Sequence, residues 1–262
     1  MNDLDSFSDK PILGVIHLKT LPGSPKQVHL EETIEFATEE AKMYVKGGLD
    51  GIIVENFGDA PFKKTVEKMT VASMTQVISE IKETIDVPLG VNVLRNDWEA
   101  ALSISKVLDL DFIRVNVFTG VVAGPEGLLE GRAAELQRFK DLHDIDTAVY
   151  ADINVKHSKS LSHEDVVGEA IEAADRGNAD AVIISGERTG MSVNLEELKN
   201  VKKKIDKPVL IGSGLNKENL SELLPHADGA IVGTYFKEEG EITKKISAER
   251  VESFMSSVEQ LR

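Results

Sequence analysis

The segment Asp152-Ile153-Asn154-Val155-Lys156-His157 carries the residues best suited to acid–base chemistry. Alternate residues of an extended segment lie on one face, so Asp152, Asn154 and Lys156 are expected to point the same way. A lysine beside an aspartate can serve as a paired ammonium, a general acid or a Schiff-base amine. Nothing nearby suggests the apolar pocket that depresses a lysine pKa, which favours positioning or acid–base work. Asp152, Lys156 and His157 are therefore catalytic candidates.

Glu55 is a fourth catalytic candidate. It ends the apolar run 51–55 and lies close in sequence to Asp59. These carboxylates can act as a base, bind Mg²⁺, or pair with Arg95 and Lys156. Carboxylates with few histidine partners prefer a hard cation, and the histidines near them lack the spacing of zinc ligands. We predict no metal site and leave the cofactor open, with Mg²⁺ as the one metal to consider.

Two glycine-bearing segments have the form of a phosphate site. Gly212-Ser213-Gly214 and Gly233-Thr234 each follow a short apolar run. Small residues let backbone N–H groups approach an anion, and the dipole of a helix that starts after such a turn adds to the attraction. Alternatively, the glycines only permit tight turns. We predict that these five residues bind the phosphate of a small ligand.

Further polar residues also follow apolar runs, and we take them as candidates for fixing hydroxyl groups or a second anion. Any one of them can be satisfied by neighbouring loops. As a set they indicate a polar ligand site, because burying unpaired polar groups costs several kcal/mol. These candidate ligand-binding residues are His17, Asn56, Asn92, Arg95, Asn116 and Thr189.

Eight short runs rich in valine and isoleucine are predicted to be the strands that position these residues, and amphipathic stretches between them are predicted to be helices. Strands that are apolar at most positions are typical of a parallel sheet buried on both faces. The predicted strands are 12–18, 51–55, 88–94, 111–118, 147–153, 181–185, 208–212 and 229–233. The predicted helices are 30–46, 71–84, 98–108, 128–143, 163–176, 195–205, 216–224 and 248–261.

The loops between each predicted helix and the next strand share a residue pattern. A glycine often ends the helix, as at Gly47-Gly48, and an aspartate opens the next strand, as at Asp50, Asp111, Asp180 and Asp228. Eight such units predict an α/β fold, a (β/α)8 TIM barrel formed as a single domain over residues 1–262, with a doubly wound open sheet as the alternative. In such barrels the functional site lies at the carboxyl ends of the strands, and phosphate loops follow strands seven and eight.

Composition excludes several classes of protein. The 262 residues include 30 Lys and Arg against 45 Asp and Glu, a net charge of −15 that disfavours binding to nucleic acid. Hydrophobic residues make up 41%, too many for a disordered chain, yet no apolar stretch is long enough to insert into a membrane. The acidic, polar first ten residues do not resemble a signal peptide, and cysteine is absent. We expect a cytoplasmic homo-oligomer.

Several strings of residues resemble the BtpA/SgcQ family along nearly the whole chain. The Glu-Asn-Phe-Gly-Asp and Asn-Val-Leu-Arg-Asn-Asp strings are the most specific. The matching segments are 14–18, 21–25, 50–62, 90–97, 112–117, 155–157, 189–190 and 228–234. The resemblance implies a barrel of the ribulose-phosphate-binding type, and it brings no catalytic residues with it. The family name comes from a cyanobacterial role in photosystem I biogenesis, with relatives near sugar-utilisation genes and in archaea.

Two functions follow as hypotheses. The first is an enzyme acting on a small phosphorylated metabolite, a sugar phosphate or a nucleotide-like ligand, by isomerisation, lyase chemistry or glycosidic cleavage. The second, suggested by the family name, is a non-catalytic assembly factor for a membrane protein complex such as photosystem I. The second predicts an exposed apolar patch, which the sequence does not reveal.

Overall fold

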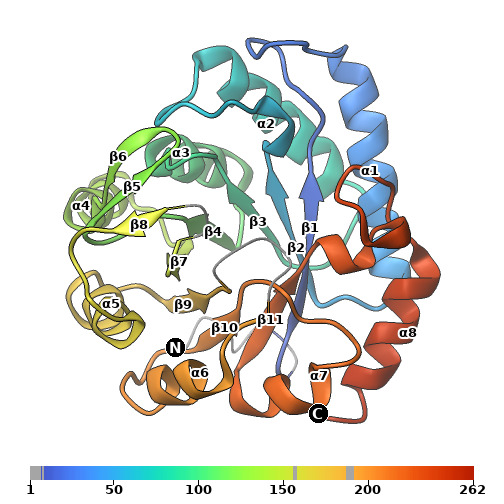
Figure 1. Ribbon diagram of the computed structural model, residues 1–262. Coiled ribbons are helices and arrows are strands. Elements are labelled where there is room, and N and C mark those ends of the chain that lie inside the picture. The colour runs from blue at the N-terminus through green and yellow to red at the C-terminus, as the bar shows by residue number, and fades with distance from the viewer. Residues whose placement is uncertain (1–6, 8, 156–157, 187–191) are drawn as a thin grey trace.

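A closed barrel of parallel strands forms the centre of the protein, as seen in a computed structural model that describes residues 7, 9–155, 158–186 and 192–262 (Figure 1). The order around the barrel is β1-β11-β10-β9-β7-β4-β3-β2. The strands are β1 (Ile12–His17), β2 (Gly51–Glu55), β3 (Leu89–Asn92), β4 (Phe112–Val115), β7 (Ala148–Ile153), β9 (Ala181–Ile184), β10 (Val209–Ile211) and β11 (Gly229–Val232). All eight lie within the predicted runs, so the (β/α)8 barrel is confirmed and the open sheet is excluded.

Helices surround the barrel on its outer face (Figure 1). They are α1 (Leu30–Lys46), α2 (Lys68–Lys82), α3 (Trp98–Leu108), α4 (Ala133–His143), α5 (Val166–Ile171), α6 (Leu195–Lys202), α7 (Leu220–Leu223) and α8 (Ala248–Val258). A π-helical turn, Glu172–Arg176, continues α5. Within the described part of the chain, no helix combines the length and apolar character needed to cross a membrane.

The prediction of a helix over 216–224 is mostly wrong. Only α7 is α-helical there, and it begins at Leu220. The side chain of Asn216 accepts hydrogen bonds from the backbone N–H groups of Glu218 and Asn219 at 3.0 and 3.1 Å. Asparagine side chains compete with helical hydrogen bonds in this way, so the first four residues form a turn.

A second, smaller sheet follows β4 and was not predicted. β5 (Val121–Gly124) and β6 (Gly127–Glu130) form an antiparallel hairpin, and β8 (Lys159–Ser160) pairs with β5. The helix predicted over 128–143 is therefore wrong at its start, and α4 begins at Ala133 instead. Gly127, at a φ of +88°, completes the hairpin turn in a conformation that glycine adopts without strain.

Aspartates that precede four of the strands tie neighbouring strands together at the amino end of the barrel. Each accepts a hydrogen bond from the backbone N–H near the start of an adjacent strand. The pairs are Asp50 with Ile12 (2.8 Å), Asp111 with Leu89 (2.8 Å), Asp180 with Val149 (2.8 Å) and Asp228 with Val209 (2.7 Å). The recurring aspartate of the sequence thus satisfies N–H groups at the end of the barrel away from the predicted site.

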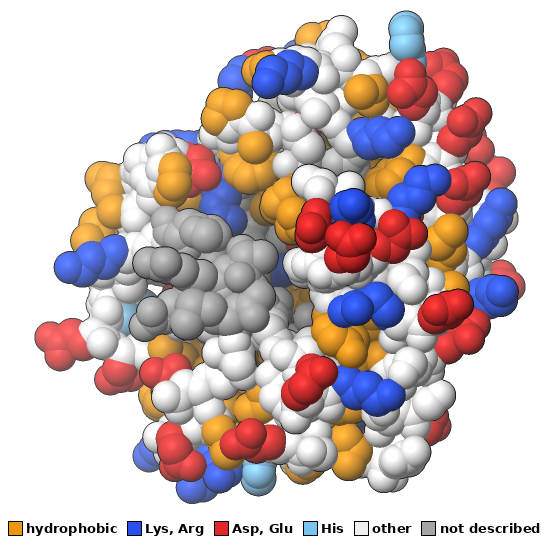
Figure 2. All heavy atoms as spheres, turned by 45° about the vertical axis from the view of Figure 1, so that its right-hand side comes forward, with side chains coloured by type: hydrophobic (Ala, Val, Ile, Leu, Met, Phe, Trp, Pro, Cys, Tyr) orange, Lys and Arg blue, Asp and Glu red, His pale blue; other side chains and the backbone are white. Residues whose placement is uncertain are grey.

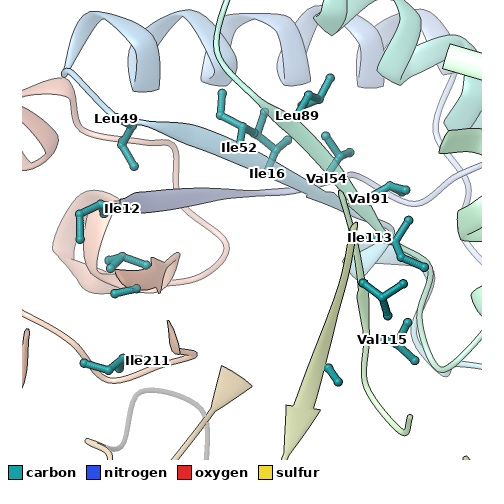
Figure 3. Packing of buried hydrophobic residues seen from close by; sticks show 14 of the residues in the cluster. Ile12, Ile16, Leu49, Ile52, Val54, Leu89, Val91, Ile113, Val115 and Ile211 are labelled. Carbon is teal, nitrogen blue, oxygen red and sulfur yellow. The ribbon is translucent and has the colours of Figure 1, made fainter. Parts of the chain in front are cut away.

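Alternation along the strands divides the apolar residues into two cores. Outward-facing side chains such as Ile16, Val54 and Val91 belong to the cluster that includes residues of the surrounding helices (Figure 3). Inward-facing side chains fill the barrel itself, and their cluster consists of Leu13, Val15, Ile53, Phe112, Ala148, Tyr150, Ala181, Ile183, Leu210 and Ile231. The barrel interior is therefore packed, and a ligand can enter only at an end.

Candidate active site

The next inward-facing position on most strands, beyond the apolar interior, is polar or glycine. These positions are His17, Glu55, Arg114, Asp152, Ser185, Gly212 and Gly233. All of them line one cavity of about 530 Å³. Figure 2 shows the surface hollowed beside the residues drawn in grey, with acidic and basic side chains interspersed on the face to the right. The strand alternation that builds the core therefore also gathers the candidate site.

Arg114 is the centre of a buried ionic network on the β2–β4–β7 side of this cavity. Its Nε and Nη2 donate to Oδ2 and Oδ1 of Asp152 at 2.9 and 3.0 Å, and its Nη1 donates to Oε1 of Glu55 at 2.9 Å. Asn116 donates from Nδ2 to Oδ2 of Asp152 at 2.6 Å. We did not predict Arg114 as a site residue, although its inward-facing position on β4 was available from the alternation.

The two carboxylates of this network differ in how many of their oxygens accept hydrogen bonds. Burial alone would lower the pKa of Arg114, but the negative charges of Asp152 and Glu55 outweigh burial and raise it, so the guanidinium stays charged. Both oxygens of Asp152 accept hydrogen bonds. The second oxygen of Glu55, Oε2, accepts none from any described residue. Glu55 therefore keeps one oxygen for chemistry, and Asp152 does not.

The turns after β10 and β11 carry backbone N–H groups that have no described partner. Ser213, Gly214, Thr234 and Tyr235 all line the cavity, and their N–H groups donate no hydrogen bond to another described residue. Three of these residues were predicted to bind phosphate. A cluster of unused N–H groups is the feature that an anion requires.

Glycine at two of these positions has a steric or conformational cause. A Cβ on Gly212 would lie 2.4 Å from Cγ2 of Ile183 and 2.5 Å from Oγ of Ser185. Gly214 has a φ of +73°, in the left-handed region. Packing against β9 therefore requires glycine at position 212, and the backbone conformation favours it at position 214.

Arg250, from the first turn of α8, also lines this side of the cavity and was missed in the sequence. Its Nε donates to the carbonyl oxygen of Tyr235 at 2.7 Å, and its guanidinium lies 4.6 Å from the centre of the Tyr235 ring. These contacts hold a positive charge beside Tyr235, in the turn that follows β11. The sequence carries no local signal for this placement, because it depends on how α8 packs.

Arg95 and Glu126 line the cavity on the β3–β4 side. Arg95, a predicted ligand-binding residue, has its Nε 3.8 Å from Oε1 of Glu126. Glu126 lies at the turn of the β5–β6 hairpin and was not predicted. The sequence Pro125-Glu126-Gly127 indicates a turn but does not reveal that the turn reaches the cavity.

Asn56 and Asn92 do not line the cavity. Asn56 is buried and joins two loops: its Oδ1 accepts from the N–H of Leu94 at 2.7 Å, and its Nδ2 donates to Asp59 at 3.1 Å. Asp59 accepts in turn from the N–H of Leu21 at 2.8 Å. Asn92 is buried at the end of β3, and its Nδ2 has no partner among the described residues.

Three predicted site residues, Lys156, His157 and Thr189, lie outside the described part of the chain. Among the described residues, no group of three or more histidine, aspartate or glutamate side chains is placed to hold a metal ion. The carboxylates nearest the ligand space instead face arginines, with Glu55 and Asp152 on Arg114 and Glu126 beside Arg95.

Comparison with known proteins identifies the family. The model of the BtpA family matches residues 8–260. The chain belongs to the BtpA family. Its BtpA-family relatives include an uncharacterised protein of Pyrococcus furiosus, 47% identical over 95% of each chain, and one of Methanocaldococcus jannaschii, 43% identical over 98% of each. The Photosystem I biogenesis protein BtpA of Synechocystis is 41% identical over 95% of this chain and 88% of its own length.

Solved structures share the fold of this BtpA-family chain at low identity. Thiamine phosphate pyrophosphorylase from Pyrococcus furiosus superposes with a TM-score of 0.62 at 15% identity, covering 99% of this chain and 98% of that one. (S)-3-O-geranylgeranylglyceryl phosphate synthase from Thermoplasma acidophilum, in complex with its substrate sn-glycerol-1-phosphate, gives 0.57 at 17% identity, covering 97% and 94%. Identities this low establish the barrel architecture alone.

Proposed function

We propose that this chain is an enzyme that acts on a small phosphorylated metabolite. The observation that carries the proposal is the composition of one cavity. Unused backbone N–H groups and Arg250 lie on the side of β10 and β11, and the network of Glu55, Arg114 and Asp152 lies on the side of β2, β4 and β7. The first set suits a phosphate, and the second suits proton transfer.

Phosphate binding is supported by local chemistry and by structural relatives. Backbone N–H groups attract an anion whatever the net charge of the protein, so −15 is no obstacle. Arg250 adds a fixed positive charge, held by Tyr235. The names of two proteins with the same fold include thiamine phosphate and a glyceryl phosphate, which is consistent with a phosphorylated ligand here. We assign Gly212, Ser213, Gly214, Gly233 and Thr234 to this phosphate site.

Glu55 is the acid–base residue of the proposal. Arg114 fixes one of its oxygens at 2.9 Å and leaves the other for a proton of the ligand. Asp152 acts through Arg114 as a positioning residue, since both of its oxygens are already used. A carboxylate that accepts and returns a proton serves isomerisation, lyase chemistry and glycosidic cleavage alike, so the reaction is defined here as proton transfer on a phosphorylated substrate.

The test separates binding from chemistry. A panel of phosphorylated metabolites is first screened for an increase in melting temperature, since a ligand that binds the native state raises it. Arg250→Met should weaken binding of each ligand found. Glu55→Gln should retain binding, because the amide oxygen still accepts from Arg114, while turnover falls by roughly 10²–10⁴-fold.

Two exposed residues provide matched controls. Arg138→Met, on α4, removes the same charge outside the cavity, and Glu252→Gln, on α8, makes the same carboxylate-to-amide change on the surface. Both should behave like the parent. Full turnover by Glu55→Gln would show that Glu55 is not the acid–base residue. Unchanged ligand binding by Arg250→Met would show that the phosphate binds elsewhere.

A non-catalytic assembly factor for a membrane protein complex is the second candidate, motivated by the printed name of the Synechocystis relative. It is also consistent with exposed apolar side chains on two neighbouring helices, Val107 on α3 and Leu142 on α4, which are 73% and 78% exposed. This function would not depend on an acid–base residue. The test is complementation of a strain that lacks the protein. If Glu55→Gln complements this strain as well as the parent protein does, the result would favour assembly over catalysis.

A further inference from the structure

The side chain of Glu126 is largely shielded from solvent, although a residue in a hairpin turn is normally exposed. The register of β5 and β6 pairs Gly124 with Gly127, which leaves Pro125 and Glu126 as the two turn residues. Pro125 is exposed, yet the side chain of Glu126 is only 9% exposed and lines the cavity. Burying a carboxylate opposes folding unless it is well paired, so this placement calls for a reason other than stability.

The pairing of Glu126 is incomplete. Its Oε1 lies 3.8 Å from Nε of Arg95, beyond a hydrogen bond, and its buried Oε2 has no partner among the described residues. The adjacent strand end shows the same pattern. Asn116 donates through Nδ2 to Asp152, which directs its Oδ1 the other way, and that buried oxygen also has no described partner. Two residues that line this cavity therefore each carry a buried hydrogen-bond acceptor without a described partner.

These acceptors lie across the barrel from the proposed phosphate turns. In the strand order, β3 and β4 are diametrically opposite β10 and β11. Asn116 follows β4, and Glu126 lies on the hairpin that also follows β4. A ligand held by its phosphate at Ser213 and Thr234 would extend its other end toward these acceptors.

The hairpin is anchored, so the acceptor is already in place before a ligand binds. β8 pairs with β5 on the side away from β6. The N–H of Val121 donates to Oγ of Ser162 at 2.7 Å, and the N–H of Gly131 donates to the carbonyl oxygen of Gly120 at 2.7 Å. A preformed acceptor contributes more to selectivity than one that must be ordered on binding.

We infer that the cavity selects a phosphomonoester whose opposite end carries hydroxyl groups, with Glu126 and Asn116 accepting hydrogen bonds from these hydroxyls. This inference rests on the proposed function and names the substrate class as phosphorylated polyhydroxy compounds. A hydroxyl can donate to Glu126 and accept from a cation, and Arg95 lies beside Glu126. An ammonium group can donate to Glu126 but has no acceptor to offer Arg95, whereas a hydroxyl can serve both.

The test uses probes that share a phosphate and a five-carbon chain and differ at the far end: pentyl phosphate, a pentitol phosphate and aminopentyl phosphate. Inorganic phosphate reports on the phosphate turns alone. Dissociation constants are measured for the parent, for Glu126→Gln and Glu126→Asp, and for Glu130→Gln. Glu130 is exposed on the same hairpin, so Glu130→Gln is the matched control.

The parent should bind the pentitol phosphate roughly ten- to a hundredfold more tightly than pentyl phosphate, the range expected of hydrogen bonds to a charged group. Glu126→Gln should reduce that preference about tenfold, because its amide N–H₂ replaces an acceptor, and Glu130→Gln should keep it. Glu126→Asp should also reduce the preference, since the aspartate side chain is shorter and its carboxylate reaches less far into the cavity. Inorganic phosphate should bind all four proteins equally.

An undiminished preference in both Glu126 variants, or tighter binding of aminopentyl phosphate than of the pentitol phosphate, would overturn this inference and leave the phosphate site intact. Failure of every probe, inorganic phosphate included, to bind the parent would overturn the proposed function and this inference with it.

Discussion

Arg114 and Asp152 form a bidentate ion pair at the wall of the cavity, with Nε–Oδ2 and Nη2–Oδ1 distances of 2.9 and 3.0 Å. Both side chains are buried. A planar guanidinium matches the two oxygens of a carboxylate, so the pair fixes the orientation of both groups. Through Nη1 the same guanidinium also holds Glu55, which links the proposed acid–base residue to the fold.

Loss of Arg114 should therefore destabilise the protein as well as inactivate it. Arg114→Met leaves Asp152 buried without its main partner, and we expect a loss of about 3–5 kcal/mol in the free energy of unfolding. Arg114→Lys should recover little of it, because an ammonium cannot form the two parallel hydrogen bonds. Urea unfolding measures both variants. A cost below about 1 kcal/mol for Arg114→Met would show that the network contributes to function without supporting the fold.

A second buried ion pair, Lys237 with Glu40, lies outside the cavity and should behave as a structural unit. Nζ of Lys237 lies 2.7 and 2.9 Å from the two oxygens of Glu40. Burial raises the pKa of Glu40 and lowers that of Lys237, and their mutual attraction opposes both changes. Lys237→Met should cost about 3–5 kcal/mol at neutral pH, and less in acid, where Glu40 can be neutral.

The double variant Glu40→Leu/Lys237→Met removes both charges and should be far more stable than Lys237→Met alone. Unfolding free energies of the parent, Glu40→Leu, Lys237→Met and the double variant form a double-mutant cycle. Additive effects of the two substitutions would contradict the description of this pair as a coupled unit.

Glu169 on α5 should make stability depend on pH. Burial raises its pKa above the ordinary value, and the N–H of Asn154, which donates to its Oε2 at 3.1 Å, offsets this in part. A raised folded-state pKa means that the folded protein holds this proton more tightly than the unfolded chain does. The associated stability is present below about pH 4.3 and is lost as the pH rises through the folded pKa.

Glu169→Gln has no such proton to lose, and its amide oxygen can still accept from Asn154. The stability of this variant relative to the parent should therefore increase from pH 4 toward neutrality. Urea unfolding across this range tests it, with the exposed Glu164→Gln as a control that should show no such trend. A difference that is flat or falls with pH would refute the assignment.

Gly90 should tolerate no side chain, because it faces the stacked rings inside the barrel. Phe112 and Tyr150 stack with centroids 4.6 Å apart, and a Cβ on Gly90 would lie 2.2 Å from the Phe112 ring. We expect Gly90→Ala to cost about 1–3 kcal/mol through overpacking. Gly168→Ala, on α5, is the control: its Cβ would make only an ordinary contact, and alanine favours a helix, so its stability should not fall. Equal melting temperatures for the two variants would contradict this packing.

Much of the fold and part of the site follow from local rules. Strand alternation explains why Glu55 and Asp152 face the ligand space, since each continues an inward-facing series of apolar residues. The same rule turns Asn56, the neighbour of Glu55, away from the cavity and into the loop around Asp59. Alternation applied strictly at this strand end would have separated Glu55 from Asn56.

Other parts of the site depend on tertiary structure that no local pattern encodes. Arg250 reaches the proposed phosphate turns because α8 packs beside the turn after β11, and Glu126 reaches the cavity because β8 holds the hairpin in place. The prediction of a helix from residue 128 onward failed for the same reason. Leu128 and Leu129 fit a helical period, but the neighbouring strand and Gly127 favour a hairpin. A short apolar run is ambiguous until its partner strand is known.

We propose that the N–H groups of Ser213, Gly214, Thr234 and Tyr235 bind phosphate, and amide NMR spectra recorded during titration with inorganic phosphate observe these four groups individually. These four resonances should shift together and saturate with a single dissociation constant, and Arg250→Met should raise that constant while Arg138→Met leaves it unchanged. Saturating shifts confined to other amides, or no saturable shift in these four, would show that phosphate does not bind at these turns.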